Sequence, residues 1–284
     1  MGNCFTCTTT TPSVKVALKL PHGLKGMVYD EKTERFQPEE SIDNWLLSLY
    51  TDSKWTGWIV YNDETSQLGD TKHTKGHCKG IVAWNDTHIS WLIHSVPNFP
   101  RIFTGATISE IESSEHMYGQ SFCYNEISNQ DTLLEDIIHH VRLMEAHIFM
   151  EHNVPHITAL KKDKHVHALV LNENITHVAK SSIHTIDIYS DYLAKQDTST
   201  WHVETWQRGS PITKKCDNVK EVHLVRWNDV EYKESQDHSK WACTDTLCWI
   251  GDLNRMKSQY KRGGGGFLIK HKAMAKAFRE LIVS

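Results

Sequence analysis

Two His-x-Lys triplets stand far apart in the chain, His77-Cys78-Lys79 and His238-Ser239-Lys240. A neutral imidazole can attack phosphorus, and a second imidazole can protonate the leaving oxygen. Lysine ammonium groups beside them can hold the phosphoryl oxygens as negative charge develops. These residue types are therefore suited to phosphoryl transfer, and the scheme needs no metal ion.

An asparagine follows each triplet, Asn98 within HSVPNFP and Asn254 within GDLNR. Each half of the chain can thus be read as His-x-Lys, strand, turn and Asn, with the amide as a further group for phosphoryl oxygens. This weak duplication predicts two similar lobes with one active site at their junction.

A third triplet, His73-Thr74-Lys75, lies in a polar stretch with no strand to fix it. The triplet at His77 runs directly into the apolar segment GIVAW. Because residues i and i+2 of a strand point to the same face, His77 and Lys79 should project together while Cys78 faces away. The spacing alone is weak evidence in a chain with 19 histidines. The alternative is that these are core or surface histidines with incidental lysines.

Short runs rich in Val, Ile and aromatic residues predict strands. They are Gly57–Tyr61, Gly80–Trp84, Ser90–His94, Val166–Leu171 and Val222–Trp227. Apolar residues at helical spacing predict one helix that starts after Asp131, includes Ile148 and ends before Pro155, and a second from His271 to Ile282. The pattern predicts a mixed α and β fold with a sheet in each half, divided into lobes 1–155 and 156–284.

The run Gly263–Gly266 allows two interpretations. It is either a flexible connector or a loop that lets the backbone approach DNA phosphates, flanked by the candidate DNA-binding residues Arg255, Lys261 and Arg262. Four tryptophans, Trp55, Trp58, Trp201 and Trp206, are candidates for base stacking, but most tryptophans are core residues. We assign them no role.

The 19 histidines accompany a formal charge of −4 at neutral pH. Protonation of histidine below pH 6 would make the protein strongly positive, so it would attract polyanions in an acidic compartment. The alternative is that histidine is merely abundant on the surface. No apolar run approaches the ~20 residues that span a bilayer.

The seven cysteines are an odd number, so at least one is free or paired between chains. Cys243 and Cys248 are close enough in sequence to bridge a short loop. Cys4 and Cys7 have the spacing of half a zinc site, but no second pair follows, and we expect neither a metal nor another cofactor.

Two long motifs resemble the signatures of the deoxyribonuclease II family: GHCKGIVAW…WLIHSVPNFP (76–100) and DHSKW…GDLNR…RGGG (237–265). Shorter similarities are KLP (19–21), YND (61–63) and YGQ (118–120). They occur in family order over most of the chain, with the middle, roughly 125 to 220, weakest.

The resemblance implies a phospholipase-D-like pseudo-dimer with both triplets in one cleft. It also implies a metal-independent acid endonuclease that leaves 3′-phosphate ends on DNA through a phosphohistidine. His77, Lys79 and Asn98 match one half-site, and His238, Lys240 and Asn254 match the other. By analogy with the wider superfamily we expect His77 to be the nucleophile and His238 the general acid, while the reverse assignment stays open.

The sequence also departs from the family pattern. Cys78 replaces the usual threonine, and Asn85 replaces an aspartate. Cysteines common at the positions of Ala242 and Trp249 are each displaced by one residue, so the disulfide framework of the family does not transfer directly.

Two other functions stay open: a DNA-binding protein or secreted effector of this fold with weakened catalysis, and a lipid-anchored phosphodiesterase. The second is prompted by the opening MGNCFT, which fits acylation at Gly2. We expect a lysosomal or secreted protein; the alternative is an acylated cytoplasmic one. DNA is the expected partner, and a homodimer is left open.

Overall fold

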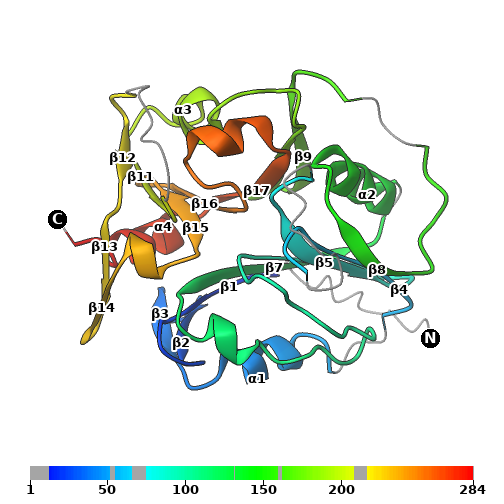
Figure 1. The fold of residues 1–284 in the computed structure, drawn as a ribbon, viewed down its shortest axis with the longest axis horizontal. Coiled ribbons are helices and arrows are strands. Elements are labelled where there is room, and N and C mark those ends of the chain that lie inside the picture. Colours follow the sequence, from blue (N-terminus) through cyan, green and yellow to red (C-terminus); the bar gives the residue numbers. More distant parts are fainter. Residues whose placement is uncertain are drawn as a thin grey trace, which may run out of the picture.

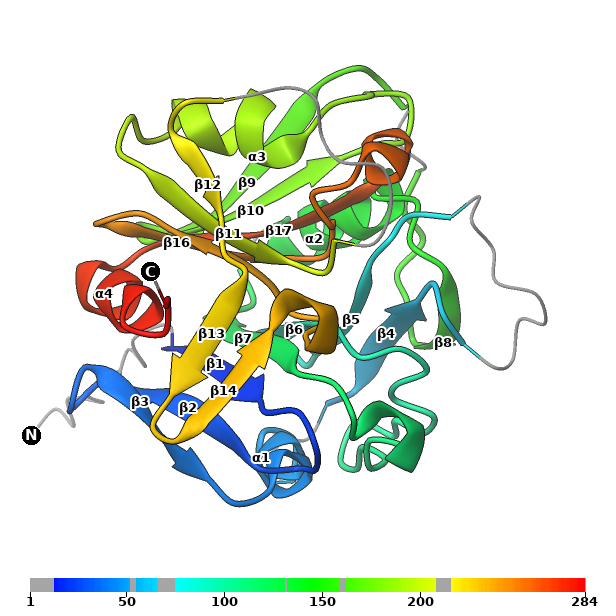
Figure 2. The ribbon, with the colours of Figure 1, turned by 60° about the vertical axis from the view of Figure 1, so that its left-hand side comes forward.

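The computed structural model describes residues 13–51, 55–65, 75–130, 132–158, 162–207 and 216–283, and its strands form two large sheets and one hairpin (Figure 1). The first sheet contains β1 (Ser13–Lys19), β2 (Gly26–Asp30), β3 (Arg35–Glu39), β4 (Gly57–Asn62), β5 (Lys79–Trp84), β6 (His88–His94), β7 (Gln120–Ser128) and β8 (Ile148–His152). The second contains β9 (Val166–Asn172), β10 (Ile175–Lys180), β11 (Trp201–Thr205), β12 (Val219–Glu221), β15 (Lys240–Cys243), β16 (Leu247–Gly251) and β17 (Gly264–Lys270). The hairpin consists of β13 (Leu224–Trp227) and β14 (Val230–Lys233), and it reaches from the second sheet toward β2 and β3 of the first (Figure 2).

The two sheets pack face to face around the main core. Trp91 of β6 lies against His177 of β10 and Phe267 of β17, with ring centroids 4.0 and 5.2 Å apart. Helices α2 (Leu133–Leu143) and α4 (Lys272–Arg279) add apolar side chains to this layer. Strands buried on both faces explain the continuous apolar runs in the sequence.

The other two helices cover the outer faces of the sheets (Figure 1). Helix α1 (Ile42–Ser48) buries Ile42, Trp45 and Leu46 against the first sheet. Helix α3 (Ile188–Asp191) buries Ile188 and Tyr189 against the second. The expected mixed α and β fold with a sheet in each half is therefore confirmed. Within the described ranges, no helix is long and apolar enough to cross a bilayer.

Five strands of the first sheet correspond to five strands of the second. The two sets have the same order along the chain and the same arrangement within their sheets. The first sheet contains the series β1-β7-β6-β5-β4, and the second contains β10-β17-β16-β15-β11. Neighbours in both series are antiparallel. This correspondence agrees with an internal duplication. The pseudo-dimer and the division near residue 155 stay predictions.

The first predicted helix is shorter than expected. Helix α2 ends at Leu143, and Ile148 lies in β8 instead. Glu145 has a φ of 58°, a left-handed conformation that stops a helix and turns the chain back. The predicted start at Asp131 falls outside the described residues. The second predicted helix is present as α4, which begins after its N-cap His271 and ends at Arg279, three residues before the predicted end at Ile282.

The glycine run is not a flexible connector. Gly264–Gly266 are the first three residues of β17, which lies between β16 and β10. A Cβ on Gly265 would lie 2.3 Å from the carbonyl oxygen of Val178, and one on Gly266 would lie 2.5 Å from that of Ile250. The run is therefore a strand without side chains that packs closely against both neighbours.

Candidate active site

A cavity of about 470 Å³ opens where the two sheets meet. Both His-x-Lys triplets contribute to it, since His77, Lys79, His238 and Lys240 all line its wall. The remaining lining residues are Asp63, Glu64, Ser95, Pro97, Trp206, Asn254, Met256, Ser258, Gln259, Lys261 and Arg262.

The topology brings the triplets together because each occupies the same place in its sheet. Lys79 is the first residue of β5 and pairs with Asn62, the last residue of β4. Lys240 is the first residue of β15 and pairs with Thr205, the last residue of β11. The histidine lies two residues before the strand in both cases, and Cys78 points into the main core. The expected alternation of His77, Cys78 and Lys79 is therefore confirmed, although the strand begins only at Lys79.

His77 is held by hydrogen bonds to the second half of the chain. Its backbone N–H donates to the carbonyl oxygen of Gly263 over 2.9 Å, and its Nδ1 lies 2.6 Å from the carbonyl oxygen of Asp252. A carbonyl oxygen can only accept, so Nδ1 carries the proton and Nε2 of the neutral ring keeps its lone pair.

The environment of His77 keeps the ring neutral. Burial lowers the pKa of His77 to about 3, although the charge of Asp63 acts in the opposite direction. The ammonium groups of Lys79 and Lys240 lower it further. His77 is therefore neutral even in moderately acidic solution.

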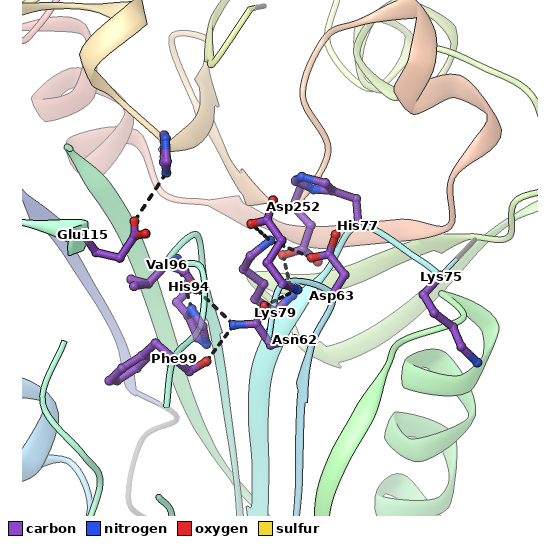
Figure 3. A network of polar contacts seen from close by, with 12 residues as sticks. Asn62, Asp63, Lys75, His77, Lys79, His94, Val96, Phe99, Glu115 and Asp252 are labelled. Carbon is purple, nitrogen blue, oxygen red and sulfur yellow. Dashed lines mark hydrogen bonds and ion pairs between the residues drawn. The ribbon is translucent and has the colours of Figure 1, made fainter. Parts of the chain in front are cut away.

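Lys79 lies in a buried network of charges (Figure 3). Its Nζ is 2.6 Å from Asp63 Oδ1 and 3.1 Å from Glu64 Oε2, and Asp63 Oδ2 accepts from Arg262 Nη2 over 2.7 Å. Burial alone would raise the pKa of Asp63, but Lys79 and its other cationic neighbours bring it well below its ordinary value. Likewise, burial would lower the pKa of Lys79, but Asp63 and Glu64 raise it above its ordinary value.

Two aromatic rings stack on the second histidine. The ring of His238 stacks on Trp206 at 3.7 Å and on Tyr118 at 4.3 Å, with interplanar angles of 23° and 12°. Its backbone N–H donates to the carbonyl oxygen of Gly119 over 2.8 Å, and Nδ1 lies 3.8 Å from Glu115 Oε2. Aromatic faces attract a cation, so an imidazolium at this position could make cation–π contacts with both rings.

Glu115 and Lys240 complete the second half-site. Burial raises the pKa of Glu115 to about 7, so this carboxyl is neutral in acid. Burial and the neighbouring charge of Lys79 lower the pKa of Lys240 to about 8. Lys240 therefore stays charged at acidic and neutral pH, and its Nζ donates to the carbonyl oxygen of His238.

The first half-site also contains a set of possible metal ligands, which the sequence did not suggest. Ligand atoms of Asp63, Glu64 and His77 lie within 4.8 Å of one another. The ammonium group of Lys79 already bridges the two carboxylates, so a metal ion would have to compete with this buried cation.

The other predicted residues divide between the cavity and its surroundings. Asn254, Lys261 and Arg262 line the cavity. Asn98 is not among the lining residues; its Nδ2 donates to Glu112 Oε2 over 2.5 Å. His73 of the third triplet falls outside the described residues, whereas Lys75 is exposed and points away from the network (Figure 3).

Arg255 is also absent from the cavity wall. It is buried in the second half, where its guanidinium bonds to Asp187 Oδ2 at 3.2 Å and Glu221 Oε1 at 2.6 Å. Its Nη2 donates to Ser190 Oγ. Because these contacts occupy the guanidinium, the expectation that Arg255 contacts DNA is corrected. Arg255 instead links elements within the second half of the chain.

Comparison with known proteins now decides the family. The family model described as deoxyribonuclease II matches residues 16–284. The chain belongs to the deoxyribonuclease II family. The family resemblance of the two long motifs is therefore confirmed.

Relatives in this family are similar over most of their length. Cell-death-related nuclease 7 of Caenorhabditis elegans is 29% identical, over 87% of this chain and 73% of that protein. Deoxyribonuclease-2-alpha of Sus scrofa is 28% identical, over 84% and 72% respectively. Plancitoxin-1 of Acanthaster planci is 29% identical, over 79% and 69%.

The sequence alone assigns no role to several residues of the site. Asp63 and Tyr118 belong to the short similarities YND and YGQ, and Asp252 to GDLNR, but none had a role. Among the candidate tryptophans, Trp201 is a fully buried core residue, whereas Trp206 lines the cavity. Only the pairing of Thr205 with Lys240 reveals that the next residue, Trp206, reaches the site.

Proposed function

We propose that this protein is an endodeoxyribonuclease that hydrolyses DNA phosphodiester bonds in acidic solution, without a metal ion, through a phosphohistidine at His77. Family membership and the names of the relatives support a nuclease acting on DNA. The main structural support is the pair of unlike histidines in one cavity. His77 is neutral with Nε2 available, and His238 stacks on the rings of Trp206 and Tyr118.

In the first step, His77 Nε2 attacks the phosphorus atom and the bond from phosphorus to the 5′ oxygen breaks. His238 donates its proton to this oxygen, which leaves as a hydroxyl group. Lys79, Lys240 and Asn254 hold the phosphoryl oxygens as charge develops. The product is a 3′-phosphoryl group bound to His77.

In the second step, water replaces His77 on phosphorus. His238, now neutral, takes a proton from the attacking water, and the bond from phosphorus to Nε2 breaks. The DNA is released with a 3′-phosphate, and both histidines return to their starting forms. The tautomer of His77 suits both steps, because Nδ1 can keep its hydrogen bond to the backbone carbonyl oxygen of Asp252 while Nε2 reacts.

The proposal includes two lobes, residues 1–155 and 156–284, arranged as a pseudo-dimer with one shared site. The common strand order of the two sheets supports it. An acidic optimum also fits a lysosomal or secreted protein, which fractionation of the native source would test.

The decisive experiment is nicking of supercoiled plasmid at about pH 5, where histidine is charged, in excess EDTA. The wild type and the exposed-histidine control His165→Ala should nick, whereas His77→Ala and His238→Ala should not. Acid-quenched wild type should carry a phosphoryl adduct on a His77 peptide. Full nicking by His77→Ala, or loss of nicking in EDTA that zinc or magnesium restores, would refute the proposal.

A further inference from the structure

Two buried lysines outside the cavity occupy equivalent places in the two sheets. Lys19 is the last residue of β1 and pairs with Gln120, the first residue of β7. Lys180 is the last residue of β10 and pairs with Gly264, the first residue of β17. Both side chains are fully buried. Because burying an ammonium group is costly, its retention at two equivalent places calls for a reason.

Lys19 binds the loop that carries Tyr118. Its Nζ donates to the carbonyl oxygens of Tyr118 at 2.6 Å, Gly23 at 3.0 Å, Leu20 at 3.1 Å and His116 at 3.3 Å. The next residue after Tyr118 is Gly119, whose carbonyl oxygen accepts the backbone N–H of His238. One ammonium group therefore fixes both the ring stacked on His238 and the backbone that holds this histidine.

Lys180 makes the same kind of contact in the other half. Its Nζ donates to the carbonyl oxygens of Tyr260 at 3.1 Å, His184 at 3.3 Å and Arg262. The next residue after Arg262 is Gly263, whose carbonyl oxygen accepts the backbone N–H of His77.

The loops held by the two lysines cross between the halves. The loop bound by Lys19 precedes β7 of the first sheet but holds His238 of the second half. The loop bound by Lys180 precedes β17 of the second sheet but holds His77 of the first. Within the described ranges, neither ammonium group contacts a carboxylate; its partners are backbone carbonyls, which are fixed in place and cannot titrate.

We propose that Lys19 and Lys180 are positioning residues, each of which fixes the loop that holds the reacting histidine of the opposite half. This rests on the proposed function for its effect on turnover, but the positioning itself is independent of it. Burial lowers the pKa of each lysine to about 8, so both ammonium groups are charged at the pH proposed for catalysis. Neither lysine is among the residues that line the cavity, so substrate binding should not depend on them.

The test replaces each lysine by methionine, which has a similar length and no donor. In Lys19→Met and Lys180→Met, kcat at pH 5 should fall by roughly 10- to 100-fold, the penalty for misplacing a reacting group by about 1 Å, with KM unchanged. Lys15→Met in β1 and Lys270→Met in β17 remove exposed lysines from the same strand and from a neighbouring strand, and should match the wild type.

A spectroscopic measurement tests positioning directly. The ring Cε1–H resonance of His238, assigned with His238→Gln, should be shifted by the two aromatic rings that stack on it. It should move in Lys19→Met and stay in place in Lys180→Met, while the resonance of His77 should do the reverse. If a methionine variant does not fold, the glutamine variant of that lysine, which keeps a polar group facing the carbonyls, should show the same changes to a smaller degree.

Folded lysine variants with wild-type kcat and unmoved resonances would overturn the proposal, as would a loss confined to KM. If the wild type fails to cleave DNA, the proposed function is wrong, but the resonances still decide whether the lysines position the histidines.

Discussion

Asp63 and Trp206 occupy equivalent positions beside the two His-x-Lys triplets. Asp63 follows Asn62, the strand partner of Lys79, and Trp206 follows Thr205, the strand partner of Lys240. In the first half-site this position supplies a carboxylate to Lys79, and in the second it supplies an aromatic face to His238. Two halves with the same strand order thus place one histidine beside a buried ion-pair network and the other against aromatic rings.

Replacing Trp206 should affect the step that needs a protonated His238. Loss of a cation–π contact costs about 0.5 to 2 kcal/mol, so Trp206→Leu should lower kcat at pH 5 by roughly 3- to 30-fold. Trp206→Phe keeps an aromatic face and should retain most of the rate. Equal rates for the two variants in steady-state plasmid cleavage would show that the aromatic face is unimportant.

The two asparagines should differ in importance. Asn254 lines the cavity, whereas the amide of Asn98 donates to Glu112. Loss of a group that stabilises the charge of a transition state typically lowers kcat by about 100- to 1,000-fold, and we expect this for Asn254→Ala. Asn98→Gly tolerates the φ of 53° at this residue and should stay within about tenfold of the wild type. A larger loss in Asn98→Gly would assign Asn98 to the site.

Glu204 should make the protein less stable at neutral pH than in acid. It is fully buried in β11, neither carboxylate oxygen has a hydrogen-bond partner among the residues that the structure describes, and burial raises its pKa well above the ordinary value. The folded protein therefore keeps this proton above pH 4.5, where the unfolded chain loses it, so the cost to stability grows as pH rises.

Glu204→Gln removes this cost. We expect the variant to be more stable than the wild type by roughly 1 to 3 kcal/mol at pH 7.5, with the gain lost near pH 4.5. Urea unfolding at both pH values measures the difference. A gain of equal size at the two pH values would contradict the assignment to titration.

His140 should make the protein less stable in acid than at neutral pH. Its Nδ1 lies 2.9 Å from His177 Nδ1, and burial lowers its pKa to about 4, helped by the neighbouring His167. Below pH 6.5 the unfolded chain binds a proton that the folded protein does not, so stability falls as pH drops from 6.5 to 4.

The advantage of the wild type over His140→Gln should therefore shrink by about 3 kcal/mol between pH 7 and pH 4 in urea unfolding. The exposed His165 provides a control, since His165→Gln should show a constant difference. A constant difference for His140→Gln would mean that folding does not lower the pKa of this histidine.

Cys243 and Cys248 should form a disulfide when the protein is refolded with oxidised and reduced glutathione. They are cross-strand partners on β15 and β16, and Thr244 N–H donates to Leu247 O in the next rung. The cysteines thus form a non-hydrogen-bonded pair, with an expected Cα separation of about 4.5 Å, which a disulfide can span. Peptide mapping should find the bridge, and Cys243→Ala should leave Cys248 open to alkylation after unfolding.

The sequence predicted the relative placement of His77 and Lys79 better than it predicted the residues that surround them. The types and spacing of His77 and Lys79 were enough to predict that they project together, because alternation along the backbone is a local property. Trp206 could not be assigned in this way, since its place beside His238 depends on the pairing of two strands distant in sequence. Arg255 was misjudged because partners far along the chain, Asp187 and Glu221, occupy its guanidinium.

Secondary structure followed the same rule. Runs such as Gly80–Trp84 were found because they are apolar throughout, and β5 closely matches this range. The glycines of β17 were taken for a loop because glycine weakens a strand in isolation, and only the adjacent backbones of β10 and β16 require it. Similarly, the left-handed Glu145 that ends α2 leaves no mark in an apolar pattern that continues to Ile148.

The crossed hydrogen bonds from His77 to Gly263 and from His238 to Gly119 make each half the scaffold of the other. A gene divided between β8 and β9 would encode two fragments, each with a histidine whose backbone anchor belongs to the missing fragment. Neither fragment alone would hold its histidine in place, and association of the two fragments would restore both backbone hydrogen bonds at once.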